Sequence, residues 1–307
     1  TQLEVEETTE AELAAEMVYG PELFYKRGSD SNDKYSHLKI VVIVGLVMGI
    51  HATGYMLYKG IDFRLFDMVK YLPVSFFYIS SMTVGYIGLR YLELSISSPV
   101  QNSSGAITAI LLFIFFKQDI DWIHILGVII ITAGVIGIAI VEKQEENKLM
   151  RLQNTVIDKK YQLGFMAVIF PIIYALLDGA GTFADGIYLD ELKLMSEDAA
   201  LLAYEYTFFI CAAIAFIYLK AIKKVQFNVF KERDKAFAAI LETTGQFFYV
   251  YAMSAYAIIA APLIASYSIF SVILSRIFLK EKLSSKHYVV ITIVMIGIIL
   301  LGIADEL

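Results

Sequence analysis

The sequence predicts an all-α membrane protein, built as a polytopic helical bundle, and three observations favour this class. First, 58% of the 307 residues are apolar and 18% are charged, whereas soluble domains average about 45–50% and about 25%. Second, apolar runs of roughly 18 to 22 residues recur along most of the chain, and each is long enough to cross a bilayer as a helix. Third, strand-like alternation is missing, and lipid does not tolerate irregular backbone. These observations exclude a soluble enzyme, a nucleic-acid binder and a disordered scaffold.

Four spans are expected in the first half of the chain, at about 38–58, 71–91, 97–116 and 122–141. The third opens with SSPVQNSS at 97–104, which carries more hydrogen-bonding groups than lipid contact permits, so this end should face the bundle interior. The fourth begins at Trp122, a typical interface anchor. Its glycines form a stripe that favours close helix contact: Gly127, Gly134 and Gly137.

Five further spans bring the expected total to nine, at about 161–188, 199–219, 235–256, 259–279 and 287–304. The loops between spans are too short for a second folded domain. When the loops are placed alternately on two sides, one side holds 19 Lys and Arg residues and the other holds five. The positive-inside rule places the first side in the cytoplasm. We therefore expect a multi-pass protein of the cell membrane with an outward-facing C-terminus.

The chain is similar to itself at an offset of 163 residues. Under this offset Pro99, Lys117, His124 and Gly134 fall on Pro262, Lys280, His287 and Gly297, and Tyr25 and Tyr86 fall on Tyr188 and Tyr249. An offset of five helices turns the second half upside down, which is the inverted duplication of many secondary transporters. The alternative is a chance alignment of two apolar helical arrays.

The duplicated stretches, 71–142 and 234–305, resemble the EamA domain of the drug/metabolite transporter (DMT) superfamily. Each contains a helix that ends in a small-residue step (YLELSISSPV, SAYAIIAAPL), a helix that closes on an apolar-Lys-acid tail (FFKQDI, FLKEKL) and a last helix with glycines. The first tail departs from the family pattern, because Gln118 stands where the second has Glu281. The resemblance implies ten helices in two inverted five-helix repeats, a central substrate cavity and alternating access.

The resemblance divides the chain into an acidic leader (1–18), an incomplete first repeat (19–142), a cytoplasmic linker (143–160) and a second repeat (161–307). The leader has six glutamates within its first 16 residues, and each charge buried in lipid costs roughly 2.5–3.5 kcal/mol, so the leader should not span the membrane. The first helix of the first repeat is thus expected to be missing or replaced. Two explanations stay open: a foreign or misread leader on a fragment, or a molecule with nine true spans.

Ionisable groups inside spans are costly and are therefore candidates for function. His51, Asp178 and Glu205 are each expected about 9–15 Å below the outer end of their spans, at 1.5 Å per residue. Carboxylates beside an imidazole could take up and release a proton during transport. As alternatives, Asp178 caps a helix broken at Gly179 and Gly181, and Glu205 lies in a water-filled vestibule.

Two further groups of polar residues complete the predicted site. Glu242 and Arg276 agree in depth within one helical turn toward the inner side, which favours a gate or structural ion pair. Alternatively, Arg276 binds a carboxylate or phosphate of the substrate. Gln101, Asn102 and Tyr267 are expected to line the pathway, although small polar groups also serve as helix-packing contacts.

These features predict a secondary transporter that moves a small organic metabolite or drug-like solute, driven by proton exchange or by the solute gradient alone. The alternatives are a truncated, non-transporting membrane scaffold and an intramembrane enzyme, which would need clustered aspartates or a His/Glu zinc motif that the sequence lacks. We expect no enzymatic activity, no cofactor and no metal site. The expected partners are the solute, the lipid bilayer and a second copy of the chain in a homodimer, but no nucleic acid.

Overall fold

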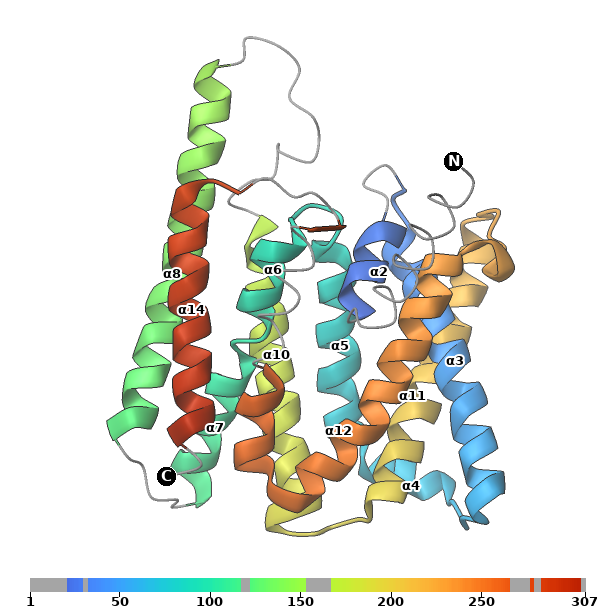
Figure 1. Cartoon of the computed structure of the whole chain (residues 1–307). Coiled ribbons are helices and arrows are strands. Elements are labelled where there is room, and N and C mark those ends of the chain that lie inside the picture. The colour runs from blue at the N-terminus through green and yellow to red at the C-terminus, as the bar shows by residue number, and fades with distance from the viewer. Residues whose placement is uncertain are drawn as a thin grey trace, which may run out of the picture.

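The computed structural model describes residues 21–29, 33–116, 122–152, 167–265, 277–278 and 283–304, and all regular secondary structure in these ranges is helical (Figure 1). The leader 1–18 and the predicted site residues Tyr267 and Arg276 lie outside the described ranges. The helices are α2 (Pro21–Gly28), α3 (Ser36–Lys59), α4 (Leu65–Lys70), α5 (Leu72–Gly88), α6 (Leu94–Gln101), α7 (Ser104–Phe116), α8 (Trp122–Leu152), α10 (Ile169–Gly186), η1 (Ile187–Glu191), α11 (Glu197–Ile217), η2 (Tyr218–Ile222), η3 (Val229–Lys231), α12 (Arg233–Ala265) and α14 (Ser285–Ala304).

The protein is an all-α, multi-pass membrane protein, as predicted. By length and composition, four described helical stretches can cross a membrane: Ser36–Lys59, Ile96–Phe116, Ile169–Glu191 and Glu197–Ile222. Shorter apolar helices accompany them at Leu72–Gly88, Ile125–Ile138 and Ser285–Leu300. All seven stretches overlap spans expected from hydropathy, because an apolar segment in lipid must satisfy its backbone hydrogen bonds within itself.

Local sequence sets several helix ends. α3 ends at Gly60, which adopts a left-handed conformation (φ 63°) and donates its N–H to the Met56 carbonyl, a common C-terminal cap. α11 begins after Ser196, whose hydroxyl accepts the backbone N–H of Ala199, as N-cap serines typically do.

The predicted span 97–116 is divided into two helices, α6 and α7, which meet at a turn over 102–103. Pro99 lies inside α6 and has no N–H to give to the helical ladder. The side chains of Asn102 and Ser103 bond the carbonyls of Ser98 and Val100. The polar cluster therefore satisfies the backbone where the span changes from one helix to the next.

Two predicted boundaries are different in the structure. The expected break between the spans 235–256 and 259–279 falls inside α12, which is helical from Arg233 to Ala265. The segment AYAIIAA at 255–261 contains neither glycine nor proline, so nothing local ends the helix there. α8 also continues past the predicted end at 141 to Leu152, and Figure 1 shows it projecting beyond α14.

In two helix pairs, the residues in contact are related by the offset of 163 residues between the repeats. A Cβ added at Gly134 of α8 would lie 2.5 Å from Val294 Cγ2 of α14, and one at Gly297 would lie 2.6 Å from Ile131 Cγ1. The offset of 163 residues exchanges Gly134 with Gly297 and Ile131 with Val294, so these two contacts are reciprocal. This reciprocity is the signature of a two-fold axis between the repeats.

α3 and α11 form the second such pair. Gly45 lies against Phe208, its own partner under the offset, and against Ala212, which is the partner of Gly49. Figure 1 shows the α8–α14 pair at one side of the bundle and the α3–α11 pair at the other, with α5, α10 and α12 between them. The acidic residues of the bundle interior that are described below lie on α10, α11 and α12.

Candidate functional site

Glu205 and His51 form a polar contact across the α3–α11 pair. The Glu205 side chain is fully buried, and its Oε1 and Oε2 atoms lie 2.8 and 2.9 Å from His51 Nδ1. The His51 side chain is 33% exposed, so the imidazole is more accessible than the carboxylate. The imidazole stacks on Tyr55 at a ring distance of 5.9 Å and meets the edge of Phe247 at 6.2 Å. The geometry suits a proton shared between imidazole and carboxylate.

Asp178 contacts a different set of groups. It accepts hydrogen bonds from Ser104 (2.8 Å) and Ser81 (3.5 Å), which lie on α7 and α5. α10 is continuous from Ile169 to Gly186, so the interpretation of Asp178 as the cap of a broken helix is wrong. Gly179 has a packing role instead, because a Cβ there would lie 2.8 Å from Ile107 Cβ.

The amides predicted to line the pathway bond within their own helix. Gln101 is buried and donates to Ser97 Oγ at 3.1 Å, while Asn102 donates to the Ser98 carbonyl at 2.9 Å. Gln101 also lies near Gly85 of α5, where an added Cβ would be 3.4 Å from its amide nitrogen. Gln101 therefore lies against α5, the helix that holds Ser81, and its place on a pathway stays a prediction.

Glu242 of α12 is held by two tyrosines. Tyr25 of α2 donates a hydrogen bond to its Oε2, and Tyr86 of α5 donates to the same atom at 3.1 Å. The two tyrosine rings pack at a centroid distance of 5.0 Å. Because Arg276 lies outside the described residues, the predicted Glu242–Arg276 ion pair stays a prediction.

Asp185 is a buried carboxylate that sequence analysis missed. Its side chain is fully buried at the last turn of α10, and Tyr71 donates a hydrogen bond to Oδ1. Its other oxygen, Oδ2, is buried without a hydrogen-bond partner in the part of the chain described. The signal was available, because Asp185 is an ionisable residue inside the predicted span 161–188.

Further tyrosines lie between these acids. The hydroxyls of Tyr78 and Tyr249 are 2.7 Å apart, and each lies 3.2 Å from Thr182 Oγ1, so the three hydroxyls form one hydrogen-bonded group. Tyr204 of α11 bonds the sulfur of Met82 at 3.0 Å. The interior is thus rich in hydroxyls, which can bond polar groups of a solute without presenting a charge.

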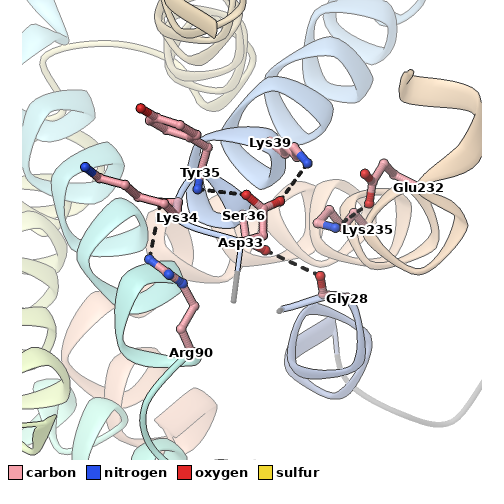
Figure 2. Close-up of polar contacts among 9 residues, drawn as sticks. All are labelled: Gly28, Asp33, Lys34, Tyr35, Ser36, Lys39, Arg90, Glu232 and Lys235. Atoms are coloured by element: carbon pink, nitrogen blue, oxygen red, sulfur yellow. Dashed lines mark hydrogen bonds and ion pairs between the residues drawn. The ribbon is translucent and has the colours of Figure 1, made fainter. Parts of the chain in front are cut away.

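The basic end is the end of the bundle that carries residues 28–29, 33–35, 90–93 and 218–233. Figure 2 shows its polar contacts, in which Asp33 accepts from Lys39 Nζ at 2.6 Å and from the Tyr35 backbone N–H at 2.9 Å. Partial burial raises the pKa of Asp33, but these two hydrogen bonds and the nearby charges of Lys39 and Lys235 outweigh it and lower the pKa below its ordinary value.

Other contacts at the basic end join the start of α3 to its neighbours. Ser36 Oγ donates to the Gly28 carbonyl at 3.5 Å, and Arg90 donates to the Lys34 carbonyl at 3.3 Å (Figure 2). Lys26 of α2 donates to the carbonyls of Leu89 and Leu92 at 2.6 and 2.5 Å. The basic end is therefore closed by contacts among α2, α3 and the end of α5.

A separate apolar pocket of about 320 Å³ lies between α3, α4 and α11. It is lined by Met56, Phe63, Leu65, Met68, Tyr206, Phe209 and Ile210. None of the predicted site residues within the described ranges lines it. Among the described residues, no cluster of three or more His, Cys, Asp or Glu side chains could hold a metal ion.

A family model described as the EamA-like transporter family matches the chain twice, over residues 23–140 and 165–303. No curated protein matches the chain. A solved structure titled "Crystal structure of protein" is similar with a TM-score of 0.60 and 9% sequence identity, over 94% of this chain and 96% of that chain. At this identity the likeness shows the fold alone.

Proposed function

Because the chain belongs to the EamA-like transporter family, we propose that it is a secondary transporter that moves a small organic solute across the cell membrane by alternating access. The coupling is proton exchange or the solute gradient alone. Transport of this kind changes no bond of the solute, so we propose that the chain is not an enzyme.

One observation carries the mechanistic part of the proposal. The reciprocal contacts of Gly134 with Val294 and of Gly297 with Ile131 relate the two repeats by a two-fold axis. In inverted-repeat transporters each half can adopt the conformation of the other, which opens the site first to one side and then to the other. The reciprocal packing supports such an exchange here, since equivalent contacts are present in both halves.

The polar groups between the repeats support an organic solute with polar or cationic groups. Glu205 and His51 supply an acid and an imidazole, and Asp178 adds a second carboxylate held by neutral hydroxyls. Polar groups inside a membrane bundle are expensive and commonly mark a substrate or ion pathway. We propose that Glu205 binds the solute or a proton that moves with it.

The test begins with a ligand. The purified full chain is screened for thermal stabilisation by pooled metabolites, and a stabilising compound is then offered to proteoliposomes with and without a pH gradient. Glu205→Gln keeps the shape of the side chain and removes its charge. We expect it to lower initial uptake about tenfold or more, which corresponds to about 1.4 kcal/mol.

The matched control is Glu197→Gln, which removes the same charge from the first turn of the same helix. It should keep uptake near that of the unaltered chain. Full uptake by Glu205→Gln would remove Glu205 from the mechanism. A folded, unaltered chain that shows no uptake of any stabilising compound would favour the scaffold alternative over transport.

Two finer features are also proposed, namely residence in the cell membrane and assembly as a homodimer. A fluorescent fusion and light scattering of the purified chain in detergent test them. Fluorescence at an internal membrane would contradict the first proposal, and a monomeric mass would contradict the second.

A further inference from the structure

Three tyrosines lie on one face of α5, counting Tyr71, the residue just before its first turn. Tyr71, Tyr78 and Tyr86 are separated by seven and eight residues, so they lie within a narrow stripe of the helix. At 1.5 Å per residue, Tyr71 and Tyr86 are about 22 Å apart along the axis, which is most of the hydrocarbon thickness. Each of these two tyrosines donates a hydrogen bond to a carboxylate, Tyr71 to Asp185 and Tyr86 to Glu242.

The carboxylate near the basic end is Glu242. Among the described residues, the titratable groups that face it are Tyr25 and Glu22 from α2, Tyr86 from α5 and Tyr204 from α11. None of these groups is a cation, and no described lysine or arginine forms an ion pair with Glu242. Its partners therefore satisfy its oxygens without neutralising its charge.

The carboxylate near the opposite end is Asp185. The titratable groups that face it are Tyr71 and Tyr78 of the α5 stripe and Tyr249 of α12. Its side chain is fully buried, and Oδ2 has no partner among the described residues. An ionised carboxylate in such a place has a large desolvation cost, which binding of a proton removes.

The internal repeat relates the tyrosines of the two places. Tyr25 and Tyr86, which hold Glu242, fall on Tyr188 and Tyr249 under the offset of 163 residues. Tyr188 packs on Tyr71 at a ring distance of 5.6 Å, and Tyr249 bonds Tyr78 at 2.7 Å. Asp185 and Glu242 are not at equivalent positions of the repeat. Equivalent tyrosines are therefore found near an acid at both ends, but the acid belongs to α10 at one end and to α12 at the other.

We propose that Asp185 and Glu242 are two proton-binding sites, one toward each end of the bundle, which are loaded and unloaded as the two ends open in turn. The inference rests on the proposed alternating access. A proton from water at the open end binds a carboxylate oxygen, and the tyrosine hydroxyl keeps its contact with the other oxygen. When that end opens again, the proton returns to water, and no other bond forms or breaks.

The test needs no solute. Infrared spectra of the purified full chain in lipid vesicles are recorded over a pH series, and the carbonyl band of protonated carboxylic acids is followed. We expect a band that grows as the pH falls, with one part lost in Asp185→Asn and another in Glu242→Gln. Asp33→Asn, at the basic end outside the bundle interior, should retain both parts.

Two conservative variants keep the test decisive where a carboxylate variant fails to fold. Tyr71→Phe should shift the Asp185 component alone, and Tyr86→Phe should shift the Glu242 component alone, because each removes one hydroxyl contact. A spectrum unchanged by all four variants would overturn the proposal. If the spectra contain the Asp185 component but no Glu242 component, the proton site at Glu242 would be overturned. An ion pair between Glu242 and Arg276 would give this result.

The outcome is separable from that of the proposed function. A chain that shows both components but transports nothing would keep the two proton sites and reject transport. A chain that transports a solute with no titrating carboxyl component would reject the two sites and keep the transporter.

Discussion

The acidic side chains inside the bundle accept hydrogen bonds from different kinds of donor. Glu205 has an imidazole, Asp178 has the hydroxyls of two serines and of Tyr174, and Glu242 and Asp185 have tyrosine hydroxyls. A donor that can itself carry a charge exchanges protons with the acid, whereas a hydroxyl only orients it. The imidazole partner thus distinguishes Glu205, proposed above to bind the solute or a proton, from Asp185 and Glu242, the two proposed proton sites, whose donors are tyrosines.

Asp33 gives a prediction about pH at the scale of one residue. Its folded-state pKa lies below the ordinary value of 3.8, so the carboxylate stabilises the fold above that pH and the contribution is lost as the pH falls through the lowered pKa. We expect the unaltered chain to melt at a higher temperature than Asp33→Asn near pH 7, and the difference to shrink at pH values below about 4. Thermal unfolding of the purified chain in detergent over a pH series measures it.

The partner variant Lys39→Gln serves as the control for this prediction. It removes the cation that donates to Asp33 at 2.6 Å, so it should lose part of the same pH-dependent stability, while the Tyr35 N–H and Lys235 retain the rest. A difference between the unaltered chain and Asp33→Asn that stays constant at every pH would contradict the assignment.

At the scale of elements, the approach of α3 to α11 depends on small residues. A Cβ added at Gly45 would lie 2.4 Å from Ala212 Cβ and 2.7 Å from the Phe208 carbonyl oxygen. The backbone cannot yield as a flexible side chain would, so Gly45→Ala should force the helices apart. We expect a loss of about 1–3 kcal/mol, the usual cost of overpacking, in reversible unfolding of the chain in mixed micelles.

Gly54 provides a control on the same helix, because no atom lies within 4 Å of a Cβ added there. Gly54→Ala should be neutral or stabilise the chain by up to about 1 kcal/mol, since alanine has the higher helix propensity. Equal effects of the two substitutions would show that packing against α11 does not limit the stability of α3.

The orientation of the whole molecule is the third scale. The basic end carries the 220–234 loop, and the opposite end carries the loop between α3 and α4. The distribution of Lys and Arg predicts that the basic end is cytoplasmic. In a Cys211→Ser background, Lys223→Cys should therefore resist a membrane-impermeant maleimide in intact cells, whereas Asp62→Cys should react.

Permeabilised cells supply the control for this measurement, because both introduced cysteines should react there. Both positions are exposed, so a lack of labelling in intact cells reports sidedness. Labelling of Lys223→Cys from outside, with Asp62→Cys protected, would reverse the orientation.

The helical spans were largely predictable because each depends on a continuous run of residues. α3, α11 and α14 lie where hydropathy places them, since any apolar run in lipid must close its own hydrogen bonds. The division of 97–116 into α6 and α7 was not predicted, although Pro99 was visible. A proline within a span is compatible with either a kink or a full turn, and the polar side chains that satisfy the freed carbonyls decide between them.

The candidate site was predictable only in its components. The cost of burying an ionisable group identified Glu205, His51 and Asp178 as candidates. It did not predict that Glu205 contacts His51 whereas Asp178 contacts serines. Asp185 was not identified. Depth along a helix follows from counting residues at 1.5 Å each. The partner of a side chain depends also on the rotation of its helix and on which helix lies opposite.

The sequence by itself determined the membrane class, most span positions, the family and the offset of 163 residues between the repeats, because all of these are carried by the order and chemistry of residues along the chain. Only the tertiary structure decided that Gly134 meets Val294, that Tyr25 and Tyr86 share Glu242, and that Asp185 is buried against Tyr71. Hydropathy fixes where a helix crosses the bilayer but leaves its rotation and its neighbours free. Close packing of side chains against other helices removes that freedom.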